Sequence, residues 1–351
     1  MISKRDILVS MKGRVEMQGV QHTSGTIQET TTKRSQVQTD LERWVERFRG
    51  DASKGKCAAY IPALAKANPE QLGICVIGQD GKKVTAGDWE AAFTLQSVSK
   101  VISFIAVCMH HGIPHVLEKV DVEPTGDAFD SMIRLEMHKP GRPFNPMINA
   151  GAITVSSLLQ GDSMQAKFDS LTSIIESMTG RRHQINEEVY ESEWKTAHRN
   201  RALAHYLTAT GFLGCPAEEA LEVYIRQCSI EVTTEDIAMI GLVLAHDGYH
   251  PLRQEQLFTK EIARLTKALM VTCGMYNASG NFAAFVGVPA KSGVSGGIMA
   301  AVPPRGRKGE TPFGDGCGIG VYGPAIDQYG NSVAGTALLG QIAGDWDLSI
   351  Y

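Results

Sequence analysis

The sequence predicts an α+β protein in which one antiparallel sheet is built from both ends of the chain. Three observations predict this fold class. Two strand-like runs lie near the start and three near the end, the block between them is mainly helical, and a helix is expected at each end of the ordered part. We expect the terminal helices to cover the sheet, with an α/β lobe over residues 36–117 and 287–351. A helical lobe is expected over residues 118–286.

The first element is expected to be a helix that begins at Thr39. Thr39 and Glu42 have the spacing of a capping box, and apolar residues follow at helical intervals from Leu41 to Phe48. Residues 1–35 are rich in Ser, Thr, Gln, Lys and Arg, and we expect them to form a mostly disordered tail.

The early strands are predicted at residues 72–77 and 82–87. They flank Gln79-Asp80-Gly81, and Asp-Gly between two strand-like runs is a good hairpin signal. The next element is a helix led by Ser97.

The middle of the chain has repeated signals for helix ends. Glycines at intervals can end helices, Pro216 can begin one helix, and Thr233 with Asp236 can cap another. After Gly287 the pattern changes to that of strands. The late elements are expected to be strands at 289–294, 297–302 and 318–322 and a closing helix at 332–342.

Composition excludes several function classes. The 351 residues carry a net charge of −4 without a basic stripe, which argues against a nucleic-acid partner. No apolar run approaches the roughly 20 residues of a membrane span. The seven cysteines are scattered without a C-x-x-C pair, so we expect free thiols and a cytoplasmic protein. The histidine pairs spaced by four are interrupted by glycine or proline, which argues against a metal site.

Ser97 and Lys100 form the most informative pair. A serine three residues before a lysine shares one helix face with it, so the hydroxyl and the amine can meet. The apolar run from Val101 to Met109 predicts a buried helix, and burial would lower the pKa of Lys100 enough for it to act as a base. Lys291-Ser292-Gly293 matches the K-[ST]-G element that accompanies S-x-x-K in acyl-serine enzymes. A surface lysine followed by a turn is the alternative.

Several polar residues are candidates for substrate contacts. Glu193 and Asn200 are seven residues apart, which on one helix places them on nearly the same face, where they would grip an amino group and an amide or carboxylate. A solvated surface pair is the alternative. Asn149 enters an apolar context and either finds a polar partner or caps a helix. Tyr276 follows a helix stop at a lobe junction, where pockets commonly form.

Six motifs in order closely resemble the serine-dependent glutaminases, from about residue 40 to the C-terminus. They are Tyr60-Ile61-Pro62, Gln96-Ser97-x-Ser99-Lys100, Asn145-Pro146-x-Ile148-Asn149-Ala150-Gly151, Ser192-Glu193 to Arg199-Asn200, Gly274-Met275-Tyr276 and Lys291-Ser292-Gly293-Val294.

The resemblance implies a serine β-lactamase/transpeptidase-like fold and hydrolysis of L-glutamine to L-glutamate and ammonia. It implies no metal or organic cofactor, and a homodimer or homotetramer. Ser97 would be the nucleophile and Lys100 its base, with Tyr276 returning a proton. Backbone N–H groups of Ser97 and Val294 would form the oxyanion hole, and Lys291-Ser292-Gly293 would support the site. The implied substrate contacts are Tyr60, Ser97, Asn149, Glu193, Asn200, Tyr224, Tyr276 and Val294.

Two rival interpretations share these motifs. A β-lactamase or transpeptidase also combines S-x-x-K with K-[ST]-G, but its S-x-N motif has no match in the middle of the helical lobe. The only match is Ser279-Gly280-Asn281, just before the late strands. A catalytically silent glutamine-binding scaffold is the non-enzymatic rival, and it would not need every reactive residue to be present.

Overall fold

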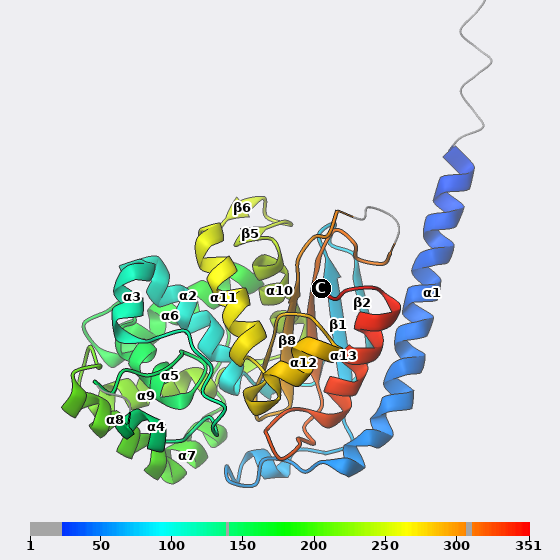
Figure 1. Cartoon of the computed structure of the whole chain (residues 1–351). Coiled ribbons are helices and arrows are strands. Elements are labelled where there is room, and N and C mark those ends of the chain that lie inside the picture. The colour runs from blue at the N-terminus through cyan, green and yellow to red at the C-terminus, as the bar shows by residue number, and fades with distance from the viewer. Residues whose placement is uncertain (1–22, 138–139, 307–310) are drawn as a thin grey trace, which may run out of the picture. The chain divides into compact units, whose positions relative to one another are not determined.

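The structure is a computed structural model that describes residues 23–137, 140–306 and 311–351. The chain divides into two units, Met1–Asp40 and Leu41–Tyr351. The second unit contains the sheet strands and the described helices from α2 onward (Figure 1).

Helix α1 runs from Thr23 to Arg49, so the first helix begins well before Thr39. The prediction that Thr39 caps this helix is wrong, because a capping residue needs a non-helical backbone and the chain is helical on both sides of it. Residues 23–35 include the good helix formers Gln28, Glu29, Lys33 and Arg34. The predicted tail is therefore helical over 23–35, and residues 1–22 lie outside the described residues.

The central sheet has five strands, and each neighbouring pair is antiparallel. Strand β1 lies between β2 and β9, which joins the early hairpin to the late strands and confirms that both ends of the chain build one sheet. The predicted hairpin is also confirmed, with Val76 opposite Val84. In spatial order the strands are β2 (Lys83–Gly87), β1 (Gly73–Gly78), β9 (Cys317–Tyr322), β8 (Gly297–Val302) and β7 (Ala290–Ser292).

Helix α10 (Thr234–Ala245) packs against one face of this sheet at unusually short range. A Cβ atom at Gly318 would lie 1.8 Å from the carbonyl oxygen of Ala238, and one at Gly320 would lie 2.0 Å from that of Thr234. Glycine is therefore required there, because any side chain would push the helix off the sheet. The sequence places α10 within the helical lobe, whereas the structure places it on the sheet.

The capping box predicted at the start of α10 is present, with Thr233 and Asp236 bonded reciprocally. Helix α13 (Val333–Asp345) covers the face of the sheet opposite α10, as predicted for the closing helix, and a Cβ at Gly335 would lie 3.0 Å from the Val321 side chain of β9 (Figure 1). Ser332 caps it by accepting a hydrogen bond from the N–H of Gly335.

The remaining described helices include those of the helical lobe, and short β3–β4 and β5–β6 pairs lie outside the main sheet (Figure 1). The helices are α3 (Ile113–Lys119), α4 (Ile133–Met137), α5 (Asn149–Ser157), α6 (Met164–Thr179), α7 (Glu187–Thr196), α8 (His198–Thr210), α9 (Ala217–Cys228), α11 (Lys260–Cys273) and α12 (Ser279–Phe285), with 3₁₀ turns at Gly50–Lys54, Leu64–Lys66, Gln96–Val98 and Tyr276–Ala278. The short strands are β3 (Phe93–Thr94), β4 (Glu231–Val232), β5 (Tyr249–His250) and β6 (Glu255–Gln256).

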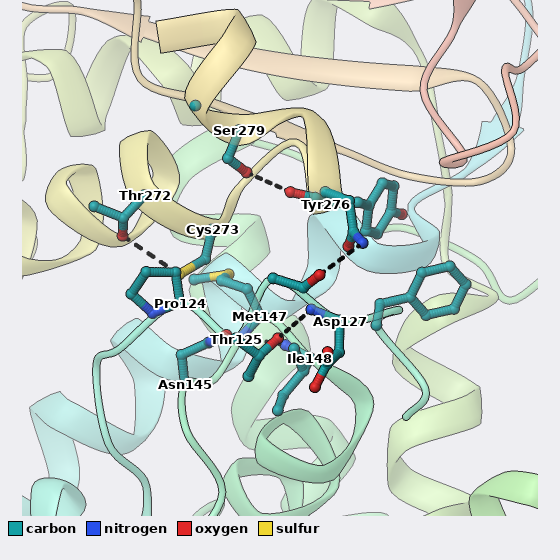
Figure 2. A pocket seen from close by; sticks show the side chains of 14 residues that line it. Pro124, Thr125, Asp127, Asn145, Met147, Ile148, Thr272, Cys273, Tyr276 and Ser279 are labelled. Atoms are coloured by element: carbon teal, nitrogen blue, oxygen red, sulfur yellow. Dashed lines mark hydrogen bonds between the residues drawn. The ribbon is translucent and has the colours of Figure 1, made fainter. Parts of the chain in front are cut away.

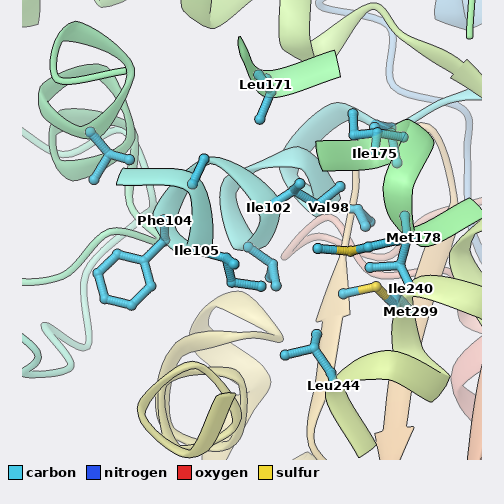
Figure 3. Packing of buried hydrophobic residues seen from close by; sticks show 14 of the residues in the cluster. Val98, Ile102, Phe104, Ile105, Leu171, Ile175, Met178, Ile240, Leu244 and Met299 are labelled. Carbon is cyan, nitrogen blue, oxygen red and sulfur yellow. The ribbon is translucent and has the colours of Figure 1, made fainter. Parts of the chain in front are cut away.

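Helix α2 (Ser99–His111) is buried from Ser99 to Cys108, as its apolar sequence predicts. Figure 3 shows it among side chains from α6, α10 and β8, such as Leu171, Leu244 and Met299. In the described chain no single helix has the length and hydropathy of a membrane span. The segments Gln96–His111 and Ile113–Lys119 pass that test only as a pair, across a 120° bend.

Candidate active site

Ser97 lies in the 3₁₀ turn that leads into α2, and its side chain is buried with 7% exposed. The preceding residue, Gln96, has a φ of 46°, a left-handed conformation that is uncommon for a residue with a side chain. Its Nε2 atom donates to Glu193 Oε2 at 3.1 Å and to the carbonyl of Cys228 at 3.4 Å. These bonds hold the strained backbone directly before the candidate nucleophile.

Lys100 is fully buried in the first turn of α2, and its amine has carbonyl partners. Nζ donates to Asn149 Oδ1 at 2.7 Å and to the Met147 carbonyl at 3.2 Å. Burial lowers the pKa of Lys100 to about 8, and the Glu193 carboxylate opposes that shift. A neutral amine has two hydrogens and one lone pair, so these two acceptors can occupy both hydrogens and leave the lone pair free.

A hydrogen bond between Ser97 and Lys100 themselves is not among those that the described residues make. The nearby Ser97 hydroxyl lowers the pKa of the Tyr276 phenol, which places these two groups close together. Ser97 and Lys100 are both buried at the start of α2 rather than facing solvent. The direct proton transfer that the spacing suggests therefore stays a prediction.

Asn149 is the centre of a polar network at the first turn of α5. Its Oδ1 atom accepts from Lys100 and also from the Tyr224 hydroxyl at 3.2 Å, and its Nδ2 atom donates to Asn200 Oδ1 at 3.0 Å. Of the two roles that the sequence left open, the partnered one is confirmed. The side chain makes no cap hydrogen bond for α5.

Glu193 and Asn200 lie on different helices, contrary to the expectation of one shared helix. Helix α7 ends at Thr196 and α8 begins at His198, with a break at Ala197. The alternative of a solvated surface pair does not hold for Glu193, which is only 7% exposed. Burial raises its pKa to about 7, while the hydrogen bond from Gln96 and the charge of Lys100 oppose the shift.

Tyr276 also has a left-handed backbone, with a φ of 51°. Its hydroxyl donates to the Ser292 carbonyl at 3.1 Å, and the Phe129 ring lies 5.0 Å from its own ring. Burial raises the pKa of the phenol well above its usual value, and the nearby Ser97 hydroxyl offsets this in part. Tyr276 is therefore a neutral hydrogen-bond donor at neutral pH.

Lys291 is buried on β7 rather than exposed in a surface turn, which excludes the alternative reading of that motif. Its Nζ atom lies 4.4 Å from the centre of the Tyr276 ring and donates to the Ser292 carbonyl at 2.6 Å. Burial lowers its pKa, and the charge of Lys100 lowers it further. Gly293 then brings the end of β7 against the turn before α2, since a Cβ there would lie 3.5 Å from the Ser97 nitrogen.

A surface pocket of about 460 Å³ lies at the edge of this cluster and is lined by Tyr60, Phe129, Val294 and Gly330 among others. Tyr60 is 54% exposed at this opening. A second pocket, of about 150 Å³, lies behind Tyr276 and is lined by Met147 and Ser279 (Figure 2). Only the smaller pocket is lined by Tyr276 itself, and neither pocket is lined by Ser97, Lys100 or Asn149.

The sequence model of the glutaminase family matches residues 55–351. The chain belongs to the glutaminase family. Glutaminase 2 of Bacillus cereus is 66% identical over 311 residues, which cover 89% of this chain and 95% of that protein. Glutaminase 1 of Bacillus subtilis is 64% identical over 311 residues with the same two coverages, 89% and 95%.

Solved glutaminase structures share the fold. A crystal structure of a probable Bacillus subtilis glutaminase has a TM-score of 0.85 and 61% identity, and covers 90% of this chain and 98% of that one. The probable Bacillus subtilis glutaminase complexed with 6-diazo-5-oxo-L-norleucine has a TM-score of 0.82 and 59% identity, and covers 90% and 97%. The predicted serine β-lactamase-like α+β fold is confirmed.

Sequence reasoning missed some groups of this glutaminase-family site. Gln96 holds Glu193, and its position next to Ser97 was the available signal. The Met147 carbonyl accepts a hydrogen bond from Lys100, but every residue has a backbone carbonyl, so the sequence gives no signal for this partner. Phe129 contacts the Tyr276 ring from a segment without motif residues.

Proposed function

We propose that this protein hydrolyses the side-chain amide of L-glutamine to L-glutamate and ammonia through an acyl ester on Ser97. The observation that carries this proposal is the network of buried Lys100, Asn149 and Tyr224 with half-buried Asn200, in a chain of the glutaminase family. One relative supports the covalent step, because a Bacillus subtilis glutaminase forms a covalent complex by reaction with 6-diazo-5-oxo-L-norleucine.

Acylation begins when Ser97 Oγ attacks the carboxamide carbon while Lys100 accepts the hydroxyl proton. A pKa of about 8 leaves a useful fraction of this amine neutral near physiological pH. The carbonyls that bind its hydrogens orient the lone pair away from themselves. The lysine can therefore act as the base without a separate histidine.

The tetrahedral intermediate then collapses to a glutamyl ester and ammonia. The backbone N–H groups of Ser97 and Val294 would stabilise the oxyanion, a contribution of about 3–4 kcal/mol per donor in enzymes where it has been measured. The leaving nitrogen takes a proton from Lys100 or through Tyr276, whose phenol is neutral and close to Ser97. Water then attacks the ester in the same way and releases L-glutamate and free Ser97.

Substrate selection would come from the two ends of the amino acid. Glu193 would pair with the α-ammonium group, and binding of that cation would draw its raised pKa down again. Asn149, Asn200 and Tyr224 would hold the α-carboxylate, with Tyr60 at the entrance. A site built for both charged groups favours a free amino acid over a peptide.

A cytoplasmic location and a homodimer or homotetramer complete the proposal. The seven cysteines are all free, and five of them are buried, which fits a reducing compartment. Light scattering coupled to size-exclusion chromatography would measure the assembly state. A monomer at micromolar concentration would contradict that part of the proposal.

The decisive experiment measures ammonia release from L-glutamine and L-asparagine and the hydrolysis of a chromogenic β-lactam. We expect turnover of L-glutamine and no opening of the β-lactam. Opening of the β-lactam without ammonia release would favour the β-lactamase-like alternative. Binding of L-glutamine in calorimetry without ammonia release would favour the silent scaffold.

A further inference from the structure

Tyr276 is held in a backbone conformation that a tyrosine rarely adopts. Its φ of 51° places it in the left-handed region, where the Cβ atom crowds the backbone. Such a conformation persists only where the surroundings determine it, and it is found at functional sites more often than elsewhere. The contacts that hold Tyr276 in this conformation therefore determine where its hydroxyl lies in the candidate active site.

Two side chains fix the peptide groups on either side of Tyr276. Asn331 Nδ2 donates to the Met275 carbonyl at 3.2 Å, which fixes the peptide before Tyr276. Ser279 Oγ donates to the Tyr276 carbonyl at 2.7 Å, which fixes the peptide after it (Figure 2). Ser279 Oγ also accepts from the Met275 N–H at 3.0 Å. Since φ and ψ are rotations between these two peptide planes, the two side chains together set the direction of the phenol.

Asn331 is itself held rigidly. It is 2% exposed, and its N–H donates at 3.0 Å to Asp327 Oδ1. The same carboxylate oxygen accepts the N–H of Gly330, where a Cβ atom would lie 3.1 Å from the Tyr276 ring. The turn therefore brings Asn331 to the backbone of Tyr276 and leaves room for the ring.

The amide of Asn331 is poorly explained by stability alone. Its buried Oδ1 atom has no hydrogen-bond partner among the described residues, and leaving such an acceptor unpaired costs free energy. An apolar side chain of similar size would avoid that cost. The Nδ2 group of Asn331, by contrast, has a defined local role, because it donates to the Met275 carbonyl.

We propose that Asn331 is a positioning residue of the reaction. With Ser279 as its counterpart, it holds Tyr276 in the left-handed conformation, so that the hydroxyl stays bonded to the Ser292 carbonyl and near Ser97. The inference rests on the proposed function, in which Tyr276 serves proton return to the leaving nitrogen. It assigns Asn331 a role through Tyr276 and no contact with the substrate.

A double-mutant cycle on the full chain tests this role. The four proteins are the wild type, Asn331→Leu, Tyr276→Phe and the double variant, with kcat and KM for L-glutamine and the unfolding midpoint measured for each. We expect Asn331→Leu to lower kcat at least about tenfold with little change in KM, because small displacements of a reacting group are costly. In the Tyr276→Phe background, where the hydroxyl is absent, the same substitution should lower kcat less than about twofold.

A matched variant separates positioning from stability. Thr266 Oγ1 also donates to a backbone carbonyl, that of Ile262 at 2.7 Å, and is fully buried. Thr266→Val should change the unfolding midpoint without changing kcat. Ser279→Ala provides the same cycle with Tyr276→Phe if Asn331→Leu does not fold.

Two results would overturn the inference. One is an active Asn331→Leu protein with unchanged kcat, and the other is a fall in kcat that is equally large with and without the Tyr276 hydroxyl. Both leave the proposed function intact because the wild type still releases ammonia. A folded wild type that releases no ammonia from L-glutamine overturns the proposed function and this inference together.

Discussion

The Nζ atom of Lys100 lies 2.7 Å from Asn149 Oδ1, deep inside the protein. The same oxygen accepts from Tyr224, and the amide nitrogen of Asn149 binds Asn200. The proposed base and the proposed carboxylate-binding groups are therefore parts of one network. A substrate that engages Asn149 would change the hydrogen bonds of Lys100, which would couple binding to activation.

Lys100→Met tests the base. The substitution keeps the length and apolar stem of the side chain but removes the amine, so kcat should fall by about 10³-fold or more. The fold should survive, since burial already disfavours the charged amine. Lys83→Met is the matched control, because Lys83 pairs with Glu235 at the surface. A Lys100→Met enzyme within tenfold of wild type would contradict the assignment.

Ser97→Ala tests the nucleophile. It should abolish ammonia release and also covalent labelling by 6-diazo-5-oxo-L-norleucine, measured by intact-protein mass spectrometry. The control is Ser103→Ala, which removes a buried hydroxyl in α2, six residues further along the chain. That variant should label and turn over like the wild type. Labelling of Ser97→Ala at an unchanged rate would place the nucleophile elsewhere.

The pH dependence of kcat/KM follows from two shifted groups of the free enzyme. Lys100, with its pKa lowered to about 8, must be neutral, and Glu193, with its pKa raised to about 7, must be ionised. Both conditions are lost as pH falls. We expect kcat/KM for L-glutamine to rise about tenfold per unit between pH 7 and 8, to level off above 8, and to fall more steeply below 7. A flat profile from pH 6 to 9 would be inconsistent with both assignments.

Glu193→Gln should separate binding from stability. KM for L-glutamine should rise by tenfold or more because the substrate ammonium loses its partner, whereas the Gln96 bond can persist to the new amide oxygen. The carboxyl pKa rises from 4.5 to about 7 on folding, so ionised Glu193 destabilises the native state by about 3 kcal/mol above pH 7. That penalty is absent below pH 4.5, develops between pH 4.5 and 7, and is fully present above pH 7.

The variant should therefore unfold at a higher temperature than wild type at pH 8.5, with little difference at pH 4.5. Thermal unfolding at the two pH values measures this. A midpoint that falls at pH 8.5 would show that Glu193 stabilises the fold.

Gly318→Ala tests the close approach of α10 to the sheet. The added Cβ would lie 1.8 Å from the Ala238 carbonyl oxygen, and neither backbone can yield without moving the helix. We expect a loss of several kcal/mol in the free energy of unfolding or no folded protein. Gly344→Ala is the control, since a Cβ in that part of α13 meets nothing within 4 Å and should stabilise the helix by about 0.5–1 kcal/mol. Chemical denaturation of both proteins gives the comparison.

Sequence reasoning succeeded where local chemistry determines the structure. The turn at Asp80-Gly81 and the capping box of Thr233 and Asp236 are set by a few neighbouring residues, and both are present. It failed at Thr39, where an equally good local signal lies inside a helix that continues through it. A capping motif indicates where a helix can begin, and the preceding residues decide whether it does.

The candidate active site likewise combines features that the sequence predicts with features that it does not. The buried environment of Lys100 was predictable from the apolar run behind it, because ten consecutive residues of α2 are buried. The break between α7 and α8 at Ala197 was not predictable from the sequence. Because of this break, Asn200 lies on a different helix from Glu193. The Met147 carbonyl and the left-handed backbones of Gln96 and Tyr276 arise from tertiary packing, which no residue pattern records.

The burial of α2 has a further consequence for how the protein would fail on heating. Lys100 keeps its low proton affinity only while the surrounding apolar side chains exclude water. Partial loosening that hydrates this helix would let the amine capture a proton while most of the secondary structure is still in place. Inactivation would then precede global unfolding. The temperature limit of the enzyme would be set by how well the surroundings of α2 exclude water rather than by the stability of the whole fold.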